Sequence, residues 1–396
     1  MTDASLHSAR SGWFSLISST VTAVVVGFAS TILVIMEAAR NVGASPSQQA
    51  SWAAALCFGM AITSLFLSWR YKMPMITAWS TPGAVLIATS GSGISYQNAL
   101  GAFVTAGVLM AVAGLIKPLE KAIEKIPAPV AAAMLAGVLL RYTLGVPGAA
   151  MALPWAVLPL IVVFFALRLS YPLFAVPVVV VAGVAIAGFS GSYAGDCCSF
   201  GITTLEWTTP AFDWQTMLSI GVPLFLVTMA SQNLPGFAVL RASGYQPPVQ
   251  PALLVTGAAS TLLAPFGSHA INMAAITASI VTGPDCHPDP KKRWLVAWPY
   301  LVLYGLIGLM AASFVQVLGA MPKDLVTAIA GLALFSPLMG GITAMMKEPR
   351  DIESALVTFL VTASGLSILG VGSAFWGLVA GLALYGARHL IQRNRR

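Results

Sequence analysis

Charged residues are scarce in this sequence of 396 residues. Only 8% are Asp, Glu, Lys or Arg, whereas 58% are hydrophobic, and a typical soluble domain has about a quarter charged residues. The deficit excludes an ordinary soluble domain and indicates a polytopic membrane protein. We expect no cleavable signal peptide, because the first apolar run, residues 13–40, is too long and no small-residue cleavage site closes it.

Cysteine is also rare, and its four positions suggest no chemistry. Cys57, Cys197, Cys198 and Cys286 lack the spacing of metal ligands. A disulfide between the adjacent Cys197 and Cys198 would be strained, so we assign none. The sequence has no His-Glu-x-x-His motif, paired aspartates or Ser-His arrangement on suitable membrane segments. We therefore expect no metal, no cofactor and no enzymatic activity.

Long hydrophobic runs are abundant. A helix needs about 20 apolar residues to span a bilayer, and the sequence contains fourteen candidate crossings, which predicts an all-α polytopic fold. The crossings are residues 14–39, 48–69, 73–90, 98–116, 128–144, 154–169, 173–189, 214–234, 249–263, 264–283, 294–314, 325–345, 352–369 and 374–391.

The few basic residues are unevenly placed. If the N-terminus is cytoplasmic, Arg40, Arg141 and Lys323 fall in outer segments, and the other 17 of the 20 Lys and Arg residues fall in cytoplasmic ones. This asymmetry predicts a multi-pass membrane protein with both termini in the cytoplasm. It also accounts for the net charge of +7 without a nucleic-acid partner.

Short motifs recur in the second half of the chain. The G-x-x-P-x-x-Q motif at residues 43–49 returns at 244–250, and the Ala-Gly pair at 136–137 returns at 330–331. Offsets of about 200 residues indicate two copies of seven crossings. Because seven is odd, the second copy must be inverted in the membrane, as in many secondary transporters.

The third and tenth crossings carry polar residues, glycine and proline at membrane depth, where non-helical backbone is tolerated only inside protein or beside a cavity. We expect residues 75–81 to be extended, with a half-helix beginning at Pro82. We likewise expect 265–271 to be extended and 272–282 to form a half-helix. Two helix N-termini aimed at one point make an anion site. The pattern suggests a transporter for a small anion.

The residues around these two helix starts are the candidate binding residues. Backbone N–H groups near 82–85 and 272–274 would bind a carboxylate, with hydroxyl and amide side chains as further donors. Alternatively, the polar side chains only cap the half-helices. The candidate set is Ser80, Thr81, Pro82, Gly83, Ser268, His269, Asn272 and Met273.

Other polar and aromatic residues could flank this site. Gln232 and Asn233 precede a Pro-Gly kink in the eighth crossing, where they form either a pocket wall or helix–helix hydrogen bonds. Phe28 and Trp79, with Met273, would receive an apolar ring, unless they face lipid or core.

Glu37 and His269 are the candidates for carrying a coupling proton. Glu37 is the acid well inside an apolar crossing, and its alternative role is an interfacial carboxylate paired with Arg40, one turn away. His269 is the histidine at membrane depth, and histidine ordinarily titrates near neutrality. Its alternative role is a neutral buried residue bonded to backbone.

The resemblance to a known family is carried by ITAWSTPGAVLIA at 76–88, MASQNLPGFAVLRASGY at 229–245, PFGSHAINMAAITA at 265–278 and Lys-Glu-Pro at 347–349. Together these stretches resemble the benzoate–proton symporter (BenE) family over nearly the whole chain, and the segment 265–278 is the most specific. That family looks related to nucleobase and sulfate permeases, which share a seven-plus-seven inverted repeat.

The resemblance implies a division into two domains. Residues 14–119 and 214–318 would form a core domain, and residues 120–190 and 319–392 a gate domain. Nucleobase relatives carry acids on the eighth and tenth crossings, whereas this chain has the amides Gln232, Asn233 and Asn272 in that neighbourhood. The departure suits an anionic substrate, because a fixed carboxylate would repel it, and it removes the obvious proton carrier.

The residues and the resemblance together predict a secondary transporter of the bacterial inner membrane that imports benzoate or a similar small aromatic carboxylate with protons by alternating access. The expected partners are that carboxylate and the lipid bilayer, with the proton as coupling ion and a homodimer as a compatible assembly. The alternatives are transport of another small anion or a nucleobase and, from a different class, an anion channel.

Overall fold

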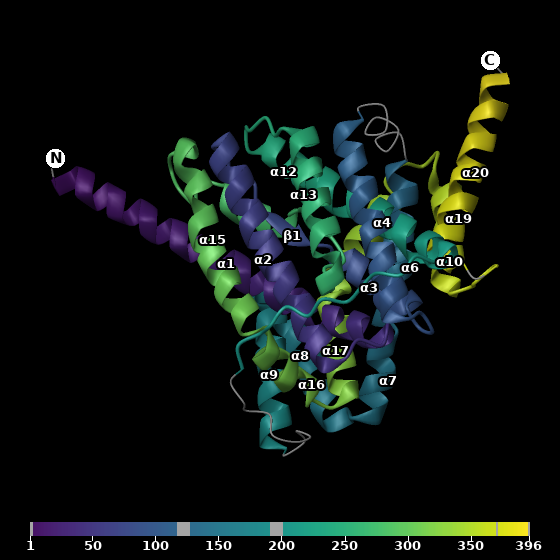
Figure 1. The fold of residues 1–396 in the computed structure, drawn as a ribbon, viewed down its shortest axis with the longest axis horizontal. Helices are drawn as coiled ribbons and strands as arrows, with labels where there is room; N and C mark the ends of the chain where they lie inside the picture. Colours follow the sequence, from purple (N-terminus) through teal and green to yellow (C-terminus); the bar gives the residue numbers. More distant parts are fainter. Residues whose placement is uncertain (1–2, 117–126, 191–200, 370, 395–396) are drawn as a thin grey trace.

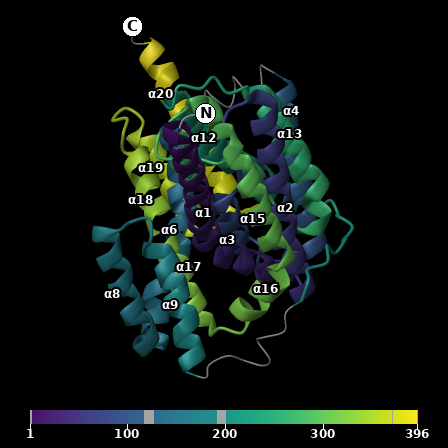
Figure 2. The ribbon, with the colours of Figure 1, turned by 90° about the vertical axis from the view of Figure 1, so that its left-hand side faces the viewer.

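The computed structural model of the protein describes residues 3–116, 127–190, 201–369 and 371–394. The prediction for Cys197 and Cys198 lies outside the described residues, and Cys57 and Cys286 are free and buried. The protein is mostly helical; α1 projects at the left of Figure 1 and α20 at its upper right, and both chain ends lie in the upper part of the two views (Figure 1, Figure 2).

The elements of the two halves of the chain follow the predicted order of crossings. In the first half they are α1 (Asp3–Asn41), α2 (Pro46–Tyr71), β1 (Thr77–Trp79), α3 (Thr81–Ser90), α4 (Tyr96–Leu115), α6 (Ala128–Thr143), α7 (Gly145–Ala152), α8 (Pro154–Ser170) and α9 (Ala175–Phe189). In the second half they are α10 (Trp214–Thr216), η1 (Met217–Gly221), α11 (Val222–Thr228), η2 (Met229–Asn233), α12 (Leu234–Ala242), α13 (Val249–Leu263), η3 (Ala264–Phe266), β2 (Ile271–Met273), α14 (Ile276–Thr282), η4 (Pro290–Val296), α15 (Ala297–Leu309), α16 (Ala311–Gly319), α17 (Lys323–Ala333), α18 (Phe335–Met345), α19 (Ile352–Ser364) and α20 (Ser373–Asn394). The turns η1 and η2 are π-helical, and η3 and η4 are 3-10 helical.

The helices fit a polytopic membrane protein. Within the described ranges, seven single helices are long and apolar enough to cross a membrane, and two bent pairs raise that number to nine. Three shorter apolar helices, α8, α9 and α19, stand where further crossings are predicted. The mostly helical, polytopic fold class is therefore confirmed.

The eleventh and twelfth predicted crossings are bent rather than straight. α15 and α16 meet at 56°, and α17 and α18 at 40°. At the first bend, the Thr203 N–H donates to the Leu309 carbonyl at 2.9 Å, and the Thr203 hydroxyl accepts the Ala312 N–H at 2.8 Å. At the second bend, Pro337 in the first turn of α18 has no N–H to bond to the preceding turn.

Two close helix pairs flank the centre of the protein. A Cβ placed on Gly257 of α13 would lie 2.3 Å from the Ala111 nitrogen of α4, so only glycine permits this approach. α2 packs against α15 in the other pair. Because α13 contacts β2 and α2 contacts β1, both pairs support the strands between them (Figure 1).

The two strands form a short antiparallel ribbon at the centre of the protein. β1 pairs with β2 so that Thr77 faces Met273 and Trp79 faces Ile271. All of its residues are buried except Ala78, which is partly exposed. This ribbon joins the third crossing to the tenth.

Side chains from neighbouring helices satisfy the polar groups along the ribbon's edges. Ser64 of α2 accepts the Thr77 N–H at 2.9 Å, and Ser260 of α13 accepts the Ile271 N–H at 2.8 Å. The Tyr300 hydroxyl donates to the Thr77 carbonyl at 2.8 Å. These bonds explain how extended backbone persists inside an apolar protein without water.

The half-helix of the third crossing begins one residue before the predicted start, Pro82. Ser80 is the N-cap, Thr81 is the first residue of α3, and Pro82 lies in the first turn. The Ser80 hydroxyl accepts the Gly83 N–H at 3.1 Å, and the Ser80 carbonyl accepts the Ala84 N–H at 2.8 Å. A Ser-Thr-Pro sequence thus converts strand into helix within three residues.

The half-helix of the tenth crossing begins later than predicted. α14 starts at Ile276, not at Asn272, and residues 264–266 form a 3-10 turn instead of an extended segment. The cause is tertiary: the Met273 N–H donates to Oδ1 of Asn233 at 2.8 Å, which holds the backbone in the ribbon. α14 is therefore only seven residues long.

Candidate functional site

The starts of α3 and α14 lie against the same stretch of α1. Thr31 of α1 shares a 2.8 Å hydrogen bond with Thr81, the first residue of α3. Four residues earlier, a Cβ on Gly27 would lie 3.1 Å from Cγ2 of Thr277, in the first turn of α14. Four helical residues rise about 6 Å. The two half-helices therefore begin near each other across one turn of α1.

The two helix starts differ in the backbone amides they leave available. At α3, Ser80 holds two of the first-turn N–H groups, and Pro82 has none. At α14, Ala275 provides no side-chain cap, and Ile276 is 62% exposed. The amides of Met273 and Ala274, which we expected to be free, are hydrogen-bonded within the ribbon and its surroundings. The helix start that is accessible and uncapped is therefore that of α14. It begins at Ile276, after residues 272–274, whose amides were predicted to be free.

Ser80 is the junction between the ribbon and α3. Thr228 of α11 donates to its hydroxyl at 2.8 Å. The Asn272 side-chain amide, in the orientation that satisfies both of its groups, accepts the Ser80 N–H at 3.0 Å and donates to the Met273 carbonyl at 3.0 Å. Ser80 and Asn272 are fully buried. These contacts fasten β2 to the start of α3, which gives both residues a positioning role.

The two amides of the eighth crossing have different environments. Asn233 is fully buried; besides accepting the Met273 N–H, its Nδ2 lies 3.3 Å from the sulfur of Met229 and 3.4 Å from that of Met110. Gln232 is half-buried on the same π-helical turn. The geometry favours a helix–strand bond for Asn233, and a place on the wall of the site stays a prediction for Gln232.

His269 uses both ring nitrogens. The Trp52 indole N–H donates to Nδ1 at 3.1 Å, and Nε2 lies 2.9 Å from the Ser80 carbonyl oxygen. Because a carbonyl oxygen only accepts, Nε2 carries the proton and the ring is neutral. A second proton, on Nδ1, would point at the Trp52 N–H. This geometry favours the neutral, backbone-bonded role over proton carriage.

Ser268 and Met273 complete the predicted set. Both are fully buried, and Met273 belongs to the ribbon. Among the described residues, the Ser268 hydroxyl has no hydrogen-bond partner. Its role as a donor to substrate stays a prediction.

Four aromatic rings gather beside the ribbon. The Phe28 ring lies 6.0 Å from that of Trp79 and 5.1 Å from that of Phe314, and Trp79 lies 6.0 Å from Tyr304, measured between centroids. The Tyr304 hydroxyl lies 3.0 Å from a Cβ placed on Gly27, so the rings adjoin the turn of α1 that meets both half-helices. Sequence reasoning identified Phe28 and Trp79 but missed the other two rings, because apolar helices carry no signal of which aromatic faces inward.

Glu37 is half-buried near the end of α1. The predicted pairing with Arg40 is absent, since no ion pair joins them within 4.0 Å among the described residues. The Arg40 guanidinium lies instead beside Gly319, the last residue of α16.

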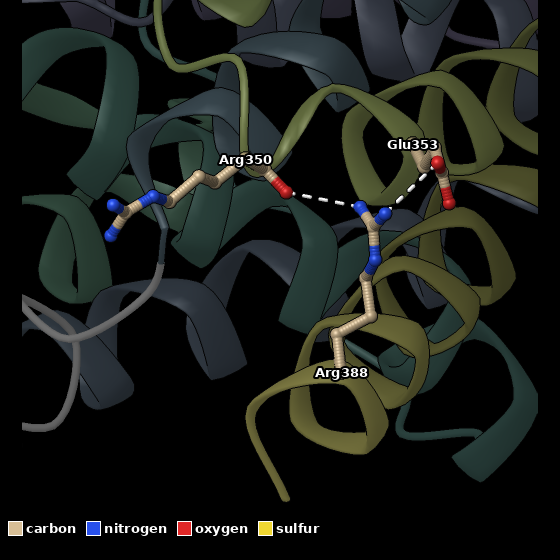
Figure 3. Close-up of polar contacts among 3 residues, drawn as sticks. All are labelled: Arg350, Glu353 and Arg388. Atoms are coloured by element: carbon tan, nitrogen blue, oxygen red, sulfur yellow. Dashed lines mark hydrogen bonds and ion pairs between the residues drawn. The ribbon is translucent and has the colours of Figure 1, made fainter. Parts of the chain in front are cut away.

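A hollow of about 180 Å³ lies between α20 and the loop before α19, away from the ribbon. There Arg388 donates to the Arg350 carbonyl at 3.0 Å and pairs with Glu353 at 2.9 Å (Figure 3). These contacts tie the loop to α20, and we assign them to the scaffold. Across the described part of the chain, no group of three His, Cys, Asp or Glu residues is placed to hold a metal ion.

Comparison with known proteins identifies the family. The family model described as "Benzoate membrane transport protein" (BenE) matches residues 13–387. The chain belongs to the BenE family. The "Inner membrane protein YdcO" of Escherichia coli K12 is 38% identical over 374 residues, covering 94% of this chain and 96% of that protein. The "Benzoate membrane transport protein" of Acinetobacter baylyi is 34% identical over 363 residues, covering 92% of each.

Solved structures show the fold of this BenE protein. The transmembrane domain of the cyanobacterial bicarbonate transporter BicA matches with a TM-score of 0.59 at 16% identity, over 94% of this chain and 97% of that domain. SLC26A9 matches with a TM-score of 0.62 at 12% identity, over 94% of this chain and 65% of that protein. The family prediction is confirmed. The protein is a multi-pass inner-membrane transport protein, not an enzyme.

Proposed function

We propose that this protein imports benzoate or a similar small aromatic carboxylate together with protons, as a secondary active transporter. The observation that carries the proposal is the convergence of two half-helix starts and a group of rings on one turn of α1, around Gly27 to Thr31. A relative at 34% identity is named a benzoate membrane transport protein. The carboxylate of such a substrate matches the half-helix starts, and its aromatic ring matches the group of rings.

The carboxylate would bind at the helix starts. Each helix N-terminus presents roughly half a positive charge, so two together offset about one anion without a fixed cation. The uncapped first turn of α14 would supply backbone N–H donors, with Thr81 beside it. The aromatic ring of the substrate would pack against Phe28, Trp79, Phe314 and Tyr304, which already make tilted and edge-to-face contacts with one another.

Alternating access would follow from an inverted repeat of seven crossings. α4 packs on α13 and α2 on α15, while α6 packs on α18 and α7 on α17. If the two halves of the chain are exchanged, the α4–α13 pair becomes the α15–α2 pair, and the α6–α18 pair becomes the α17–α7 pair. A twofold repeat requires this correspondence. The core (14–119, 214–318) would then move against the gate (120–190, 319–392). Both chain ends lie in the upper part of the view in Figure 2, which suits two cytoplasmic termini.

Transport driven by an acid gradient tests this function. In proteoliposomes with an acidic exterior, we expect labelled benzoate to accumulate and to run out again when the gradient is collapsed. One proton per monoanion makes the cycle electroneutral, so a membrane potential alone should not drive uptake. Uptake indifferent to the pH gradient would remove proton coupling. Competition by uracil or sulfate would instead favour another substrate, and large single-channel currents would favour a channel.

The coupling residue can be tested at His269. We expect His269→Gln to weaken the contacts with Trp52 and Ser80 and so to lower the free energy of unfolding by about 1–3 kcal/mol. The melting temperature should fall accordingly. The dependence of uptake on the pH gradient should stay unchanged, because the ring is held neutral. Gradient-driven accumulation that disappears in a folded His269→Gln protein would make His269 the proton carrier. Glu37→Gln is the matched comparison, and there we expect accumulation to be lost.

A further inference from the structure

Arg293 is a buried cation at the end of α14. It is 8% exposed, its Nε donates to the His287 carbonyl at 2.7 Å, and its Nη1 donates to the Thr282 carbonyl at 2.7 Å. Thr282 is the last residue of α14. Since no described carboxylate pairs with Arg293 within 4.0 Å, its charge is balanced by backbone carbonyls at a helix C-terminus, the end where a cation is favourable.

The next residue, Trp294, holds the entrance to the third crossing. The Lys72 ammonium lies 3.9 Å from the centre of the Trp294 ring and 5.7 Å from that of Trp69. Lys72 ends α2 in the left-handed conformation, with φ of 54°, and the chain then runs directly into β1. The cation–π contact therefore fixes the turn from which the extended segment departs.

Both residues lie on the rigid turn η4. Asp289 caps it by accepting the Lys291 N–H at 2.9 Å, and the Tyr245 hydroxyl donates to the Pro290 carbonyl at 2.9 Å. η4 contacts α1, α2, α14 and α15. This one short turn thus contacts the last residue of α14 and the end of α2, from which the chain enters the third crossing.

We propose that Arg293 and Trp294 form a clasp that positions the two broken crossings for substrate binding. The inference rests on the proposed function, in which the start of α14 binds the carboxylate. A helix of seven residues has little stability of its own, so its position depends on what holds its ends. β2 holds the start of α14, and the clasp holds its end. Without Arg293, the carbonyls of Thr282 and His287 lose their charged donor and α14 loosens from its end toward the site.

Two measurements test the clasp, one of them independent of substrate. Hydrogen exchange of residues 276–282 should be faster in Arg293→Met than in the wild type. In proteoliposomes, Arg293→Met should raise the KM for benzoate about tenfold, the value of a charge-assisted hydrogen bond, with a smaller change in Vmax. Arg293→Lys should recover part of the loss, because it restores one charged donor. Trp294→Ala should raise KM less.

Lys292→Met is the matched control, because Lys292 is an exposed cation on the same turn; it should change neither measurement. Wild-type exchange and KM in Arg293→Met would overturn the clasp. The clasp would also be overturned if Arg293→Met lowered the amount of folded protein and Vmax in parallel and Arg293→Lys restored neither. Arg293 would then have only a structural role. If the wild type takes up no benzoate, the proposed function fails, and the exchange of residues 276–282 still decides whether the clasp holds α14.

Discussion

Asn272→Asp should lower the affinity for benzoate about 30-fold while leaving most of the protein folded. A carboxylate about 8 Å from a bound anion opposes it by about 2 kcal/mol at an effective dielectric of 20, which is about 30-fold. The substituted side chain still accepts the Ser80 N–H but loses the bond to the Met273 carbonyl, at a cost of about 1 kcal/mol, and burying an ionised carboxylate at this fully buried position destabilises the protein further. We therefore expect the melting temperature to fall as well, and the affinity is compared on the protein that is folded.

The measurement is benzoate binding by calorimetry, together with the melting temperature of the purified protein. Asn272→Ser is the control, because it removes both contacts of the amide without adding charge, and we expect it to bind benzoate within a few-fold of the wild type. If a folded Asn272→Asp protein binds benzoate normally, the substrate does not lie near the junction of β2 and α3. If both variants lose affinity equally, the amide matters through its hydrogen bonds and not through charge.

Local signals in the sequence were sufficient for the third crossing. Ser80, Thr81 and Pro82 cap and start a helix by chemistry that acts within four residues, so the start of α3 was predictable. The span 249–263 was likewise predicted with the bounds of α13. Pro337, in the middle of the predicted crossing 325–345, indicates the bend between α17 and α18, which the prediction of a single crossing missed.

Long-range contacts decide what the sequence did not reveal. α14 starts at Ile276 because Asn233, forty residues earlier, takes the Met273 N–H, and no cap residue at Ala275 announces the start. The bend after Leu309 depends on Thr203, more than a hundred residues away. Hydropathy cannot show such partners, because it describes each segment by itself and not the neighbours that the fold brings to it.

In the candidate site, too, local sequence identifies the residues, and long-range contacts determine their roles. Polar residues that stand out in an apolar run, such as His269 and Asn272, were found, but their roles depend on partners in other helices. Trp52 fixes the tautomer of His269, and Ser80 turns Asn272 toward α3. Sequence reasoning located the polar centre of the protein correctly and assigned more of it to the substrate than the hydrogen bonds leave free.

Gly27→Val should reduce benzoate transport about 100-fold or more without unfolding the protein. Gly27 is where α1 meets both the rings and the start of α14: a Cβ there already lies 3.0 Å from the Tyr304 hydroxyl and 3.1 Å from Cγ2 of Thr277. Valine adds two further carbons to that space, so it excludes the substrate or displaces α14, and steric exclusion of a ligand costs several kcal/mol. Within α1 itself, valine is a better helix former than glycine, which offsets part of the crowding in the folded state.

The series Gly27→Ala and Gly27→Val separates crowding from helix propensity. Alanine requires its neighbours to move only by tenths of an ångström, so we expect a few-fold loss of transport and an unchanged or higher melting temperature. Gly305→Val is the matched control, because Gly305 adjoins Tyr304 on α15 and a Cβ there meets nothing within 4 Å; it should transport normally. Uptake by Gly27→Val equal to that of Gly305→Val would show that the substrate passes elsewhere, and the turn of α1 that joins the two half-helices would then be only a packing contact.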